Sequence, residues 1–281
     1  MLKNVIRLSR FEDYYHTVIL ATVAGMLLSG TYTLHVVPLI LANMFYMAFS
    51  FAFNNSQDYK EDRKDKKKSN VVSRGRIKYS DAVIVSFIFL LLSVSFIVMT
   101  KIELIFIYAP AILLSFLYSW RKVRLKTKPM IDVFIHGFAF GGIFVLSGYL
   151  LSGSLDEIST AFFLAAFFAS ASVEILNEIR DFNGDKSQSF RTTAIVLGKK
   201  NARAAFLVFL SLSAVFTLYA FFMLLEFKRF FIWTLLALPM TLYIFLSLKK
   251  YNDIAKDILQ VFNTLKLSYI PFVFGLFIYT L

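Results

Sequence analysis

Two stretches of this sequence repeat the same polar pattern, Asn-x3-Asp-x3-Asp. The two copies are Asn54, Asp58 and Asp62, and Asn177, Asp181 and Asp185. Residues four apart lie on the same side of an α-helix, so each trio would form one polar stripe. Carboxylates at this spacing repel each other, and we therefore expect a cation between them.

The donor atoms of the two stripes predict which cation they hold. Carboxylate and amide oxygens without imidazole or thiolate suit a hard cation such as Mg²⁺ or Ca²⁺. Mg²⁺ commonly uses one or two carboxylates together with phosphate oxygens, and Lys and Arg follow both stripes. One stripe alone could be a solvated helix end, given Lys60 and Arg63 nearby. Two copies in the same order favour a metal-bridged diphosphate site.

The elements that carry the stripes are predicted to cross a membrane. The chain is 58% hydrophobic and only 17% charged, which is typical of a membrane protein. Apolar runs of about 17–25 residues can span the hydrocarbon layer as helices. Nine such runs are predicted, at 14–30, 35–53, 81–100, 103–119, 131–152, 158–176, 204–225, 230–248 and 267–281. We expect an all-α polytopic bundle around a central cavity with a polar mouth. It would be a single domain (1–281) of two similar halves, about 1–125 and 126–281.

The distribution of charge predicts the orientation of the bundle. Of the 30 Lys and Arg residues, all but Lys101, Lys228 and Arg229 fall on one side of the predicted spans. By the positive-inside rule this side is cytoplasmic, with the N-terminus inside and the C-terminus outside. We therefore expect an integral protein of the cell membrane with its site at the cytoplasmic face. The net charge of +12 then reflects topology and contact with lipid, not nucleic acid.

Further residues are candidates for binding or structure. Glu174 lies one turn before Asn177, and a carboxylate at membrane depth is a functional candidate by default. Tyr118 and Lys122, four apart, would share a helix face as interfacial anchors or ligands. Gly137 and Gly141 predict close helix packing. No role follows from sequence for Arg7, Arg10, His16 or His136. The absence of cysteine excludes disulfides and thiol nucleophiles.

These motifs resemble the UbiA-type intramembrane prenyltransferases over nearly the whole chain. The family's Asn-Asp-x2-Asp-x3-Asp is similar to Asn54-Asn55-x2-Asp58-x3-Asp62 and to Asn177-Glu178-x2-Asp181-x3-Asp185. The pair Tyr118-Ser119 with Lys122 and Arg124, and the segments Arg191-Thr192 and Leu197-Gly198, are also family-like. The chain departs from the pattern at Asn55 and Glu178, and in the loop from Ser69 to Gly75.

The resemblance implies a Mg²⁺-dependent prenyltransferase of lipid or quinone biosynthesis. It would move an isoprenoid chain from a prenyl diphosphate to a lipophilic or aromatic acceptor. The implied metal ligands are the six stripe residues, with Asp58, Asp62, Asp181 and Asp185 as the principal and catalytic ones, holding two Mg²⁺ ions. The implied diphosphate ligands are Asn54, Tyr118, Lys122, Asn177, Lys186 and Arg191.

Two other functions were weighed against this prediction, and the acceptor is left open by the sequence. A cation transporter could use paired Asp sites between similar halves, but the Asp groups end their spans instead of lying at the midplane. A CDP-alcohol phosphotransferase would carry its Asp cluster within one segment, and that pattern is absent from the sequence. No residue selects the acceptor among quinone-precursor aromatics, haem, a glyceryl ether phosphate and a carotenoid. The length of the prenyl chain is equally open.

Overall fold

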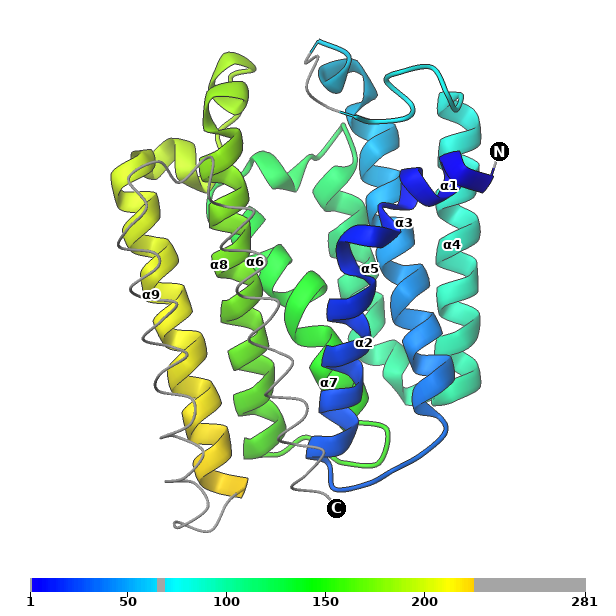
Figure 1. Ribbon diagram of the computed structural model, residues 1–281, viewed down its shortest axis with the longest axis vertical. Coiled ribbons are helices and arrows are strands. Elements are labelled where there is room, and N and C mark those ends of the chain that lie inside the picture. Colours follow the sequence, from blue (N-terminus) through cyan, green and yellow to red (C-terminus); the bar gives the residue numbers. More distant parts are fainter. Residues whose placement is uncertain (1, 65–68, 225–281) are drawn as a thin grey trace.

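The computed structural model describes residues 2–64 and 69–224, which form a bundle of helices joined by loops (Figure 1). The α-helices are α1 (Leu2–Ser9), α2 (Phe11–Leu28), α3 (Val36–Asp62), α4 (Tyr79–Thr100), α5 (Ile105–Ser119), α6 (Ile131–Gly137), α7 (Ile143–Tyr149), α8 (Glu157–Ser187) and α9 (Thr193–Leu224). The short helices are the 3₁₀ turns η1 (Ile102–Leu104) and η2 (Leu125–Thr127), and the π-helix η3 (Phe138–Gly142). The predicted all-α fold is confirmed.

Six helical segments of the described residues are long and apolar enough to cross a membrane. They are Val36–Asp62, Tyr79–Thr100, Ile102–Ser119, Ile131–Tyr149, Glu157–Ser187 and Thr193–Leu224. The predicted span at 14–30 corresponds to α2, which is not among the six. The predicted spans at 230–248 and 267–281 lie outside the described residues. The predicted count of nine is therefore not confirmed.

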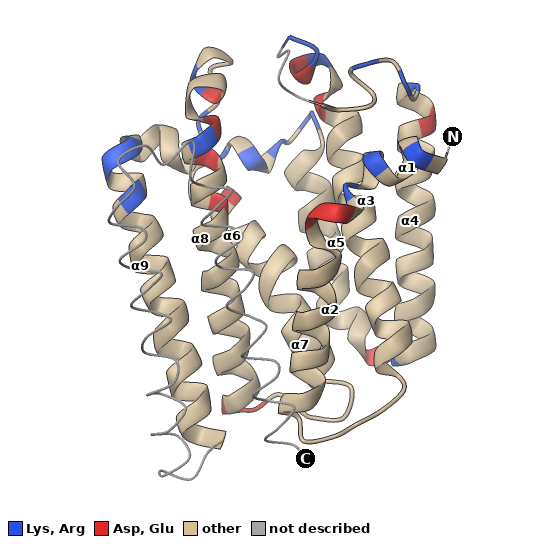
Figure 2. Ribbon diagram, in the orientation of Figure 1, with Lys and Arg blue, Asp and Glu red and all other residues tan. Residues whose placement is uncertain are grey.

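The helices that carry the two stripes end on the same side of the bundle. α3 and α8 continue past their predicted apolar runs, so each stripe is helical, as the spacing predicts. α4 packs along α3 and α9 packs along α8. Figure 2 shows Lys and Arg concentrated at the end of the bundle where α3 and α8 finish. The fold thus brings both stripes and most of the described basic residues to one end.

Two glycines let α2 and α7 approach backbone to backbone. A Cβ on Gly25 would lie 2.0 Å from the carbonyl oxygen of Val145, and one on Gly148 would lie 2.1 Å from that of Thr22. Both distances are far below van der Waals contact. Small residues at such crossings allow the dense packing that holds membrane helices together.

We expect Gly25→Ala to lower the free energy of unfolding by about 1–3 kcal/mol, because the added methyl group must push the two helices apart. Thermal unfolding in detergent measures this. The matched control is Gly184→Ala, because a Cβ at that helical position would meet nothing within 4 Å beyond its chain neighbours and the backbone of its own helix. An unfolding temperature of Gly25→Ala equal to that of the wild type would contradict the close contact.

The predicted packing role of Gly137 and Gly141 is confirmed, and the partner is α8. A Cβ on Gly141 would lie 2.3 Å from that of Ser170, and one on Gly137 would lie 2.9 Å from the carbonyl oxygen of Phe167. The π-helix η3 lies at this contact and packs directly on α8.

The start of α8 is fixed by a capping box. The Asp156 carboxylate accepts a hydrogen bond from the Ser159 amide (2.7 Å), and the Ser159 hydroxyl oxygen accepts one from the Asp156 amide (2.9 Å). Burial alone would raise the pKa of Asp156, but hydrogen bonds from Tyr149 and Ser159 outweigh it and lower that pKa. The cap therefore stabilises the fold at neutral pH, and its contribution is lost as the pH falls through this lowered pKa.

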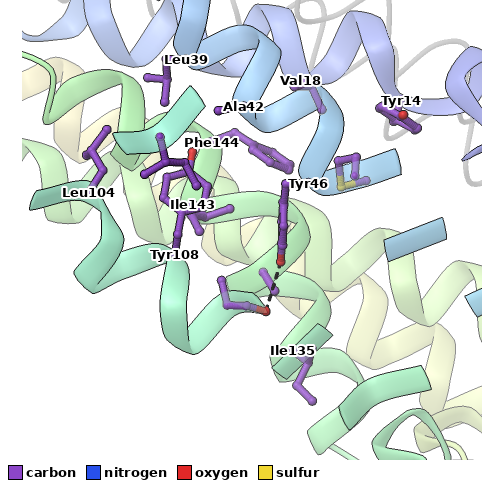
Figure 3. Close-up of a cluster of buried hydrophobic side chains, with 14 residues drawn as sticks. Tyr14, Val18, Leu39, Ala42, Tyr46, Leu104, Tyr108, Ile135, Ile143 and Phe144 are labelled. Carbon is purple, nitrogen blue, oxygen red and sulfur yellow. Dashed lines mark hydrogen bonds between the residues drawn. The ribbon is translucent and has the colours of Figure 1, made fainter. Parts of the chain in front are cut away.

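A buried cluster of aromatic and aliphatic side chains joins α2, α3, α5 and α7 beneath the first stripe (Figure 3). Buried polar side chains beside the cluster pair with its tyrosines and with one another. The Tyr46 hydroxyl contacts Ser115 Oγ (2.5 Å), and Asn43 donates to Thr22 Oγ1 (2.8 Å) and accepts from Tyr108. Pairing is required at this depth, since no water is there to bond unsatisfied groups. The cluster fixes α3 against α5, and thereby the position of Asn54 two turns beyond Tyr46.

Candidate active site

The first stripe is covered by cations from the loop that follows α5. Lys126 Nζ lies 2.8 Å from Asn54 Oδ1 and also bonds Asp58 Oδ2, while Arg124 Nη2 lies 3.0 Å from Asp58 Oδ1. Ser119 Oγ donates to Asn54 as well (3.2 Å). The Asp58 side chain is only 14% exposed, so its charge is balanced by these two cations and not by water.

The last member of the first stripe is contacted by the loop after α3. Asn70 Nδ2 donates to Asp62 Oδ2 (2.9 Å) and to the carbonyl oxygen of Asn55 (2.8 Å), and Asn70 Oδ1 accepts from the Val72 amide (2.9 Å). Asn70 is buried, and its contacts with Asp62 and Asn55 hold the loop onto the end of α3, while the contact with Val72 lies within the loop. The sequence analysis did not single out Asn70, although it lies in the loop from Ser69 to Gly75 that differs from the family pattern.

Glu61 is a carboxylate at this end of α3 that the sequence analysis missed. Glu61 Oε1 lies 2.8 Å from Arg121 Nη2 and 3.1 Å from Arg124 Nη1. Arg124 is therefore held between Glu61 and Asp58, and its guanidinium carbon lies 4.7 Å from the centre of the Phe190 ring. Because Phe190 belongs to the loop after α8, Arg124 connects the first stripe to the second half of the chain.

The second stripe is more open than the first. Asn177 Nδ2 donates to Glu174 Oε2 (3.3 Å), and Arg180 contacts its neighbour Asp181 (3.0 Å). The Asp181 side chain is 31% exposed, about twice the fraction of Asp58. Asp185 is half-buried, and Lys186 and Arg191 are exposed at this end of α8.

Tyr118 and Lys122 do not share a helix face, so that prediction is wrong. The helix α5 ends at Ser119 because the backbone turns extended at Trp120. The Tyr118 hydroxyl donates to Glu174 Oε1 (2.6 Å), whereas Lys122 is exposed with Nζ 5.7 Å from the Trp120 ring. Arg124 and Lys126 reach Asp58 in place of Lys122.

The two departures within the stripes, Asn55 and Glu178, have structural explanations. Asn55 donates to the carbonyl oxygen of Leu8 (2.8 Å), so it anchors α1 to α3. Glu178 accepts from the Ala194 amide at the start of α9 (2.7 Å). Beside it, buried Asp132 accepts from the Thr193 amide (2.9 Å) and hydroxyl (2.5 Å). Both second-position residues therefore hold neighbouring helices in place.

The donor set of the two stripes fits Mg²⁺ completed by a phosphorylated substrate. Among residues 2–64 and 69–224, no three carboxylate or imidazole groups converge closely enough to hold a metal by themselves. Mg²⁺ does not require such a cage, because it commonly takes one or two carboxylates with water and phosphate oxygens. Two acidic stripes at one end of the bundle, with cations beside them, are compatible with this kind of site (Figure 2).

Comparison with known proteins gives one consistent result. The sequence pattern of the UbiA prenyltransferase family matches residues 18–280. The digeranylgeranylglyceryl phosphate synthase of Methanobrevibacter smithii is 28% identical over 192 residues, which are 65% of each chain. That of Methanococcus aeolicus is 29% identical over 185 residues, 64% of this chain and 63% of the relative. The chain thus spans slightly less than two thirds of the length of these relatives.

Solved structures share the fold over almost the whole chain. A UbiA homologue from Archaeoglobus fulgidus bound to GPP and Mg²⁺ superimposes with a TM-score of 0.78 at 22% identity, covering 97% of this chain and 99% of the other. A UbiA homologue from Aeropyrum pernix superimposes with a TM-score of 0.77 at 16% identity, covering 95% and 98%. At these identities the likeness is one of fold.

Proposed function

The chain belongs to the UbiA prenyltransferase family, and we propose that it transfers an isoprenoid chain from a prenyl diphosphate to a lipophilic or aromatic acceptor with the help of Mg²⁺. The observation that carries the proposal is the arrangement at one end of the bundle. There the Asn-Asp-Asp stripes of α3 and α8 finish together, and Arg124 and Lys126 lie on the first of them.

In this proposal the four Asp residues of the stripes are the principal ligands of two Mg²⁺ ions. The ligand set is Asp58, Asp62, Asp181 and Asp185, assisted by Asn54 and Asn177. When bound there, Mg²⁺ would neutralise the diphosphate and stabilise the negative charge that develops on it as a leaving group. The protein's part is to place these oxygens on two helices that are fixed by the core beneath them.

Arg124 and Lys126 are placed to bind the diphosphate. Both are paired with Asp58, and both are charge-assisted donors that phosphate oxygens can also accept. If a diphosphate bound at the stripe, Arg124 and Lys126 would exchange the Asp58 carboxylate for phosphate oxygens. Lys122, Lys186 and Arg191, which sequence analysis proposed for this role, are exposed at the same end and would add to the positive field.

Aromatic side chains beneath the stripes can stabilise the allylic cation. The Phe140 ring centre lies 5.8 Å from that of Tyr118 and 6.5 Å from that of Tyr46. A cation over such faces is stabilised by about 0.5–2 kcal/mol per ring when water is excluded. These rings would guide the prenyl chain from the stripes into the bundle.

The acceptor that we place first is a glyceryl ether phosphate. The curated relatives that match this chain carry the name digeranylgeranylglyceryl phosphate synthase. We further propose that the site opens at the cytoplasmic face of the cell membrane, because Lys and Arg gather at that end (Figure 2). A single domain of two similar halves, each contributing one stripe, is part of the same proposal.

We expect Arg124→Ala and Lys126→Ala each to raise KM for the prenyl diphosphate about 10- to 100-fold, since each removes a charge-assisted hydrogen bond. Steady-state kinetics with varied prenyl diphosphate measures the change. Lys128→Ala is the matched control, because Lys128 is exposed and lies on the same loop. An unchanged KM in both variants would remove these residues from the diphosphate site.

The function is tested by product identification. Purified protein is incubated with geranyl, farnesyl or geranylgeranyl diphosphate and with an alkylglycerol phosphate, a hydroxybenzoate, haem or a carotenoid. Each reaction is run with and without Mg²⁺, and mass spectrometry detects the prenylated product. We expect a product and released diphosphate only with Mg²⁺. The proposal would be refuted if no combination gave a prenylated product and none released diphosphate.

A further inference from the structure

One buried carboxylate lies next to the second stripe without belonging to it. Glu174 is three residues before Asn177 on α8, which places its Cα about 4.5 Å farther from the acidic end of the helix. Its side chain is only 11% exposed and lies within a membrane-spanning segment. Carboxylates in such positions are costly to bury and rarely occur without a function. The contacts of Glu174 indicate what that function is.

Polar groups from three helices meet at Glu174. Its Oε1 accepts a hydrogen bond from the Tyr118 hydroxyl of α5 (2.6 Å). Its Oε2 accepts one from Asn177 Nδ2 on the same helix (3.3 Å), and Nε2 of His136 on α6 lies 3.3 Å from the same oxygen. His136 is itself held one turn earlier on α8, where its Nδ1 lies 2.9 Å from Ser170 Oγ. These contacts fix the carboxylate in one orientation.

The carboxylate of Glu174 determines which way the Asn177 amide turns. An ionised carboxylate offers only acceptors, so Asn177 must present its NH₂ group to it. The amide oxygen Oδ1 is then the polar atom of Asn177 that is left for another partner. No residue among 2–64 and 69–224 donates a hydrogen bond to this oxygen. Mg²⁺ takes oxygen ligands, so this orientation presents the atom that the metal can use.

The end of α5 contributes to holding the asparagines of both stripes. Ser119 Oγ donates to Asn54 Oδ1 (3.2 Å) in the first stripe. The preceding residue, Tyr118, holds Glu174, which in turn holds Asn177 in the second stripe. The two asparagines stand at the same position of their stripes. Two consecutive residues of one helix therefore help to orient both amides.

We propose that Glu174 is a positioning residue of the metal site, an inference that rests on the proposed Mg²⁺-dependent prenyl transfer. By holding the nitrogen of the Asn177 amide, Glu174 directs the amide oxygen to the ion that the proposed function places at Asp181. Outer carboxylates that orient a metal ligand are common, and their replacement typically lowers metal affinity about 10- to 100-fold. Tyr118 and His136 act on the same amide indirectly, because they hold the carboxylate.

Equilibrium dialysis of Mn²⁺ against the purified protein, alone and with inorganic diphosphate, tests the inference without catalysis. Mn²⁺ takes the same kind of oxygen ligands as Mg²⁺. We expect Glu174→Gln to weaken Mn²⁺ binding about 10-fold or more, because an amide can donate as well as accept and no longer fixes the orientation of Asn177. Tyr118→Phe removes one support of the carboxylate and should weaken binding about threefold. Glu157→Gln is the matched control, since Glu157 is exposed at the opposite end of α8.

A double-mutant cycle separates positioning from the loss of a negative charge. Asn177→Asp should raise Mn²⁺ affinity about 10-fold more in the Glu174→Gln background than in the wild-type background. The reason is that both oxygens of a carboxylate at position 177 can bind the ion whichever way the side chain turns. If Glu174 acted only through its charge, the gain would be equal in both backgrounds. If Glu174 only held helices together, Glu174→Gln would lower the unfolding temperature in detergent and leave Mn²⁺ affinity unchanged.

Unchanged Mn²⁺ affinity in Glu174→Gln, or an equal gain from Asn177→Asp in both backgrounds, would overturn the inference. If Glu174→Gln does not fold, Tyr118→Phe decides, and wild-type affinity in that variant would overturn it. Binding that is lost in Asp181→Ala but unchanged in Glu174→Gln would overturn the inference and leave the proposed metal site standing. A wild-type protein that binds no Mn²⁺ under either condition would instead refute the proposed metal site, and the inference with it.

Discussion

Replacing Asp58 or Asp181 by alanine is expected to lower the rate of prenyl transfer at least about 100-fold, because each change removes a proposed principal ligand of the metal that would stabilise the leaving diphosphate. The two residues stand at the same position of the two stripes, so the losses should be similar. The loss should be partly restored by high Mg²⁺ if the main effect is on metal affinity. Steady-state rates over a Mg²⁺ titration measure both effects.

The Asp58 variant has a second consequence that tests the geometry. Without Asp58, Arg124 loses one of its two carboxylate partners, and Lys126 loses the one carboxylate it contacts among residues 2–64 and 69–224. Asp58→Asn is a useful companion, since it keeps the shape and removes the charge. Asp81→Asn is the control, because Asp81 is exposed at the start of α4. Near-wild-type rates in both Asp58→Ala and Asp181→Ala would rule out the metal site proposed above.

Replacing Asp132 by alanine is expected to lower the free energy of unfolding by about 2–4 kcal/mol, because buried hydrogen-bond donors would lose their acceptor. Asp132 is fully buried and accepts hydrogen bonds from the Thr193 amide and hydroxyl and from the Val133 amide. These bonds attach the start of α9 to the start of α6. Thermal or denaturant unfolding in detergent measures the loss.

The control for Asp132 is a carboxylate outside such a network. Glu103 is exposed in the η1 turn, so Glu103→Ala should change stability by no more than about 0.5 kcal/mol. Thr193→Val should reproduce part of the Asp132 loss, since it removes the hydroxyl and keeps the amide. Equal stability of the Asp132→Ala and Glu103→Ala variants would contradict the role assigned to Asp132.

The sequence predicts the stripes well because their geometry is local. A spacing of four places Asn54, Asp58 and Asp62 on one helix face whatever surrounds them, and the apolar run before them marks the helix. The same reasoning placed Tyr118 and Lys122 on one face of a helix, and that prediction was wrong. The helix ends at Ser119, and Arg124 then adopts a left-handed backbone conformation (φ 52°) that leads into η2. The pattern of apolar and polar residues does not predict that turn.

The contacts between distant segments could not be predicted from spacing. Lys126 meets Asp58 across 68 positions, and Tyr118 meets Glu174 across 56. Glu61 carried no signal because a carboxylate among Lys60, Asp62 and Arg63 resembles any solvated helix end. Asn55 and Glu178 stood out only as departures from a family pattern. Their roles as anchors became visible once Leu8 and Ala194 were placed beside them.

In the proposed site, the cations that cover Asp58 would link metal binding to substrate binding thermodynamically. Binding of Mg²⁺ alone at Asp58 would displace Arg124 and Lys126 from this carboxylate and leave both without that partner. Binding of a diphosphate together with the ion would supply both cations with a new anionic partner. Linkage is reciprocal, so the prenyl diphosphate should raise the affinity for Mg²⁺ by the same factor as Mg²⁺ raises the affinity for the prenyl diphosphate.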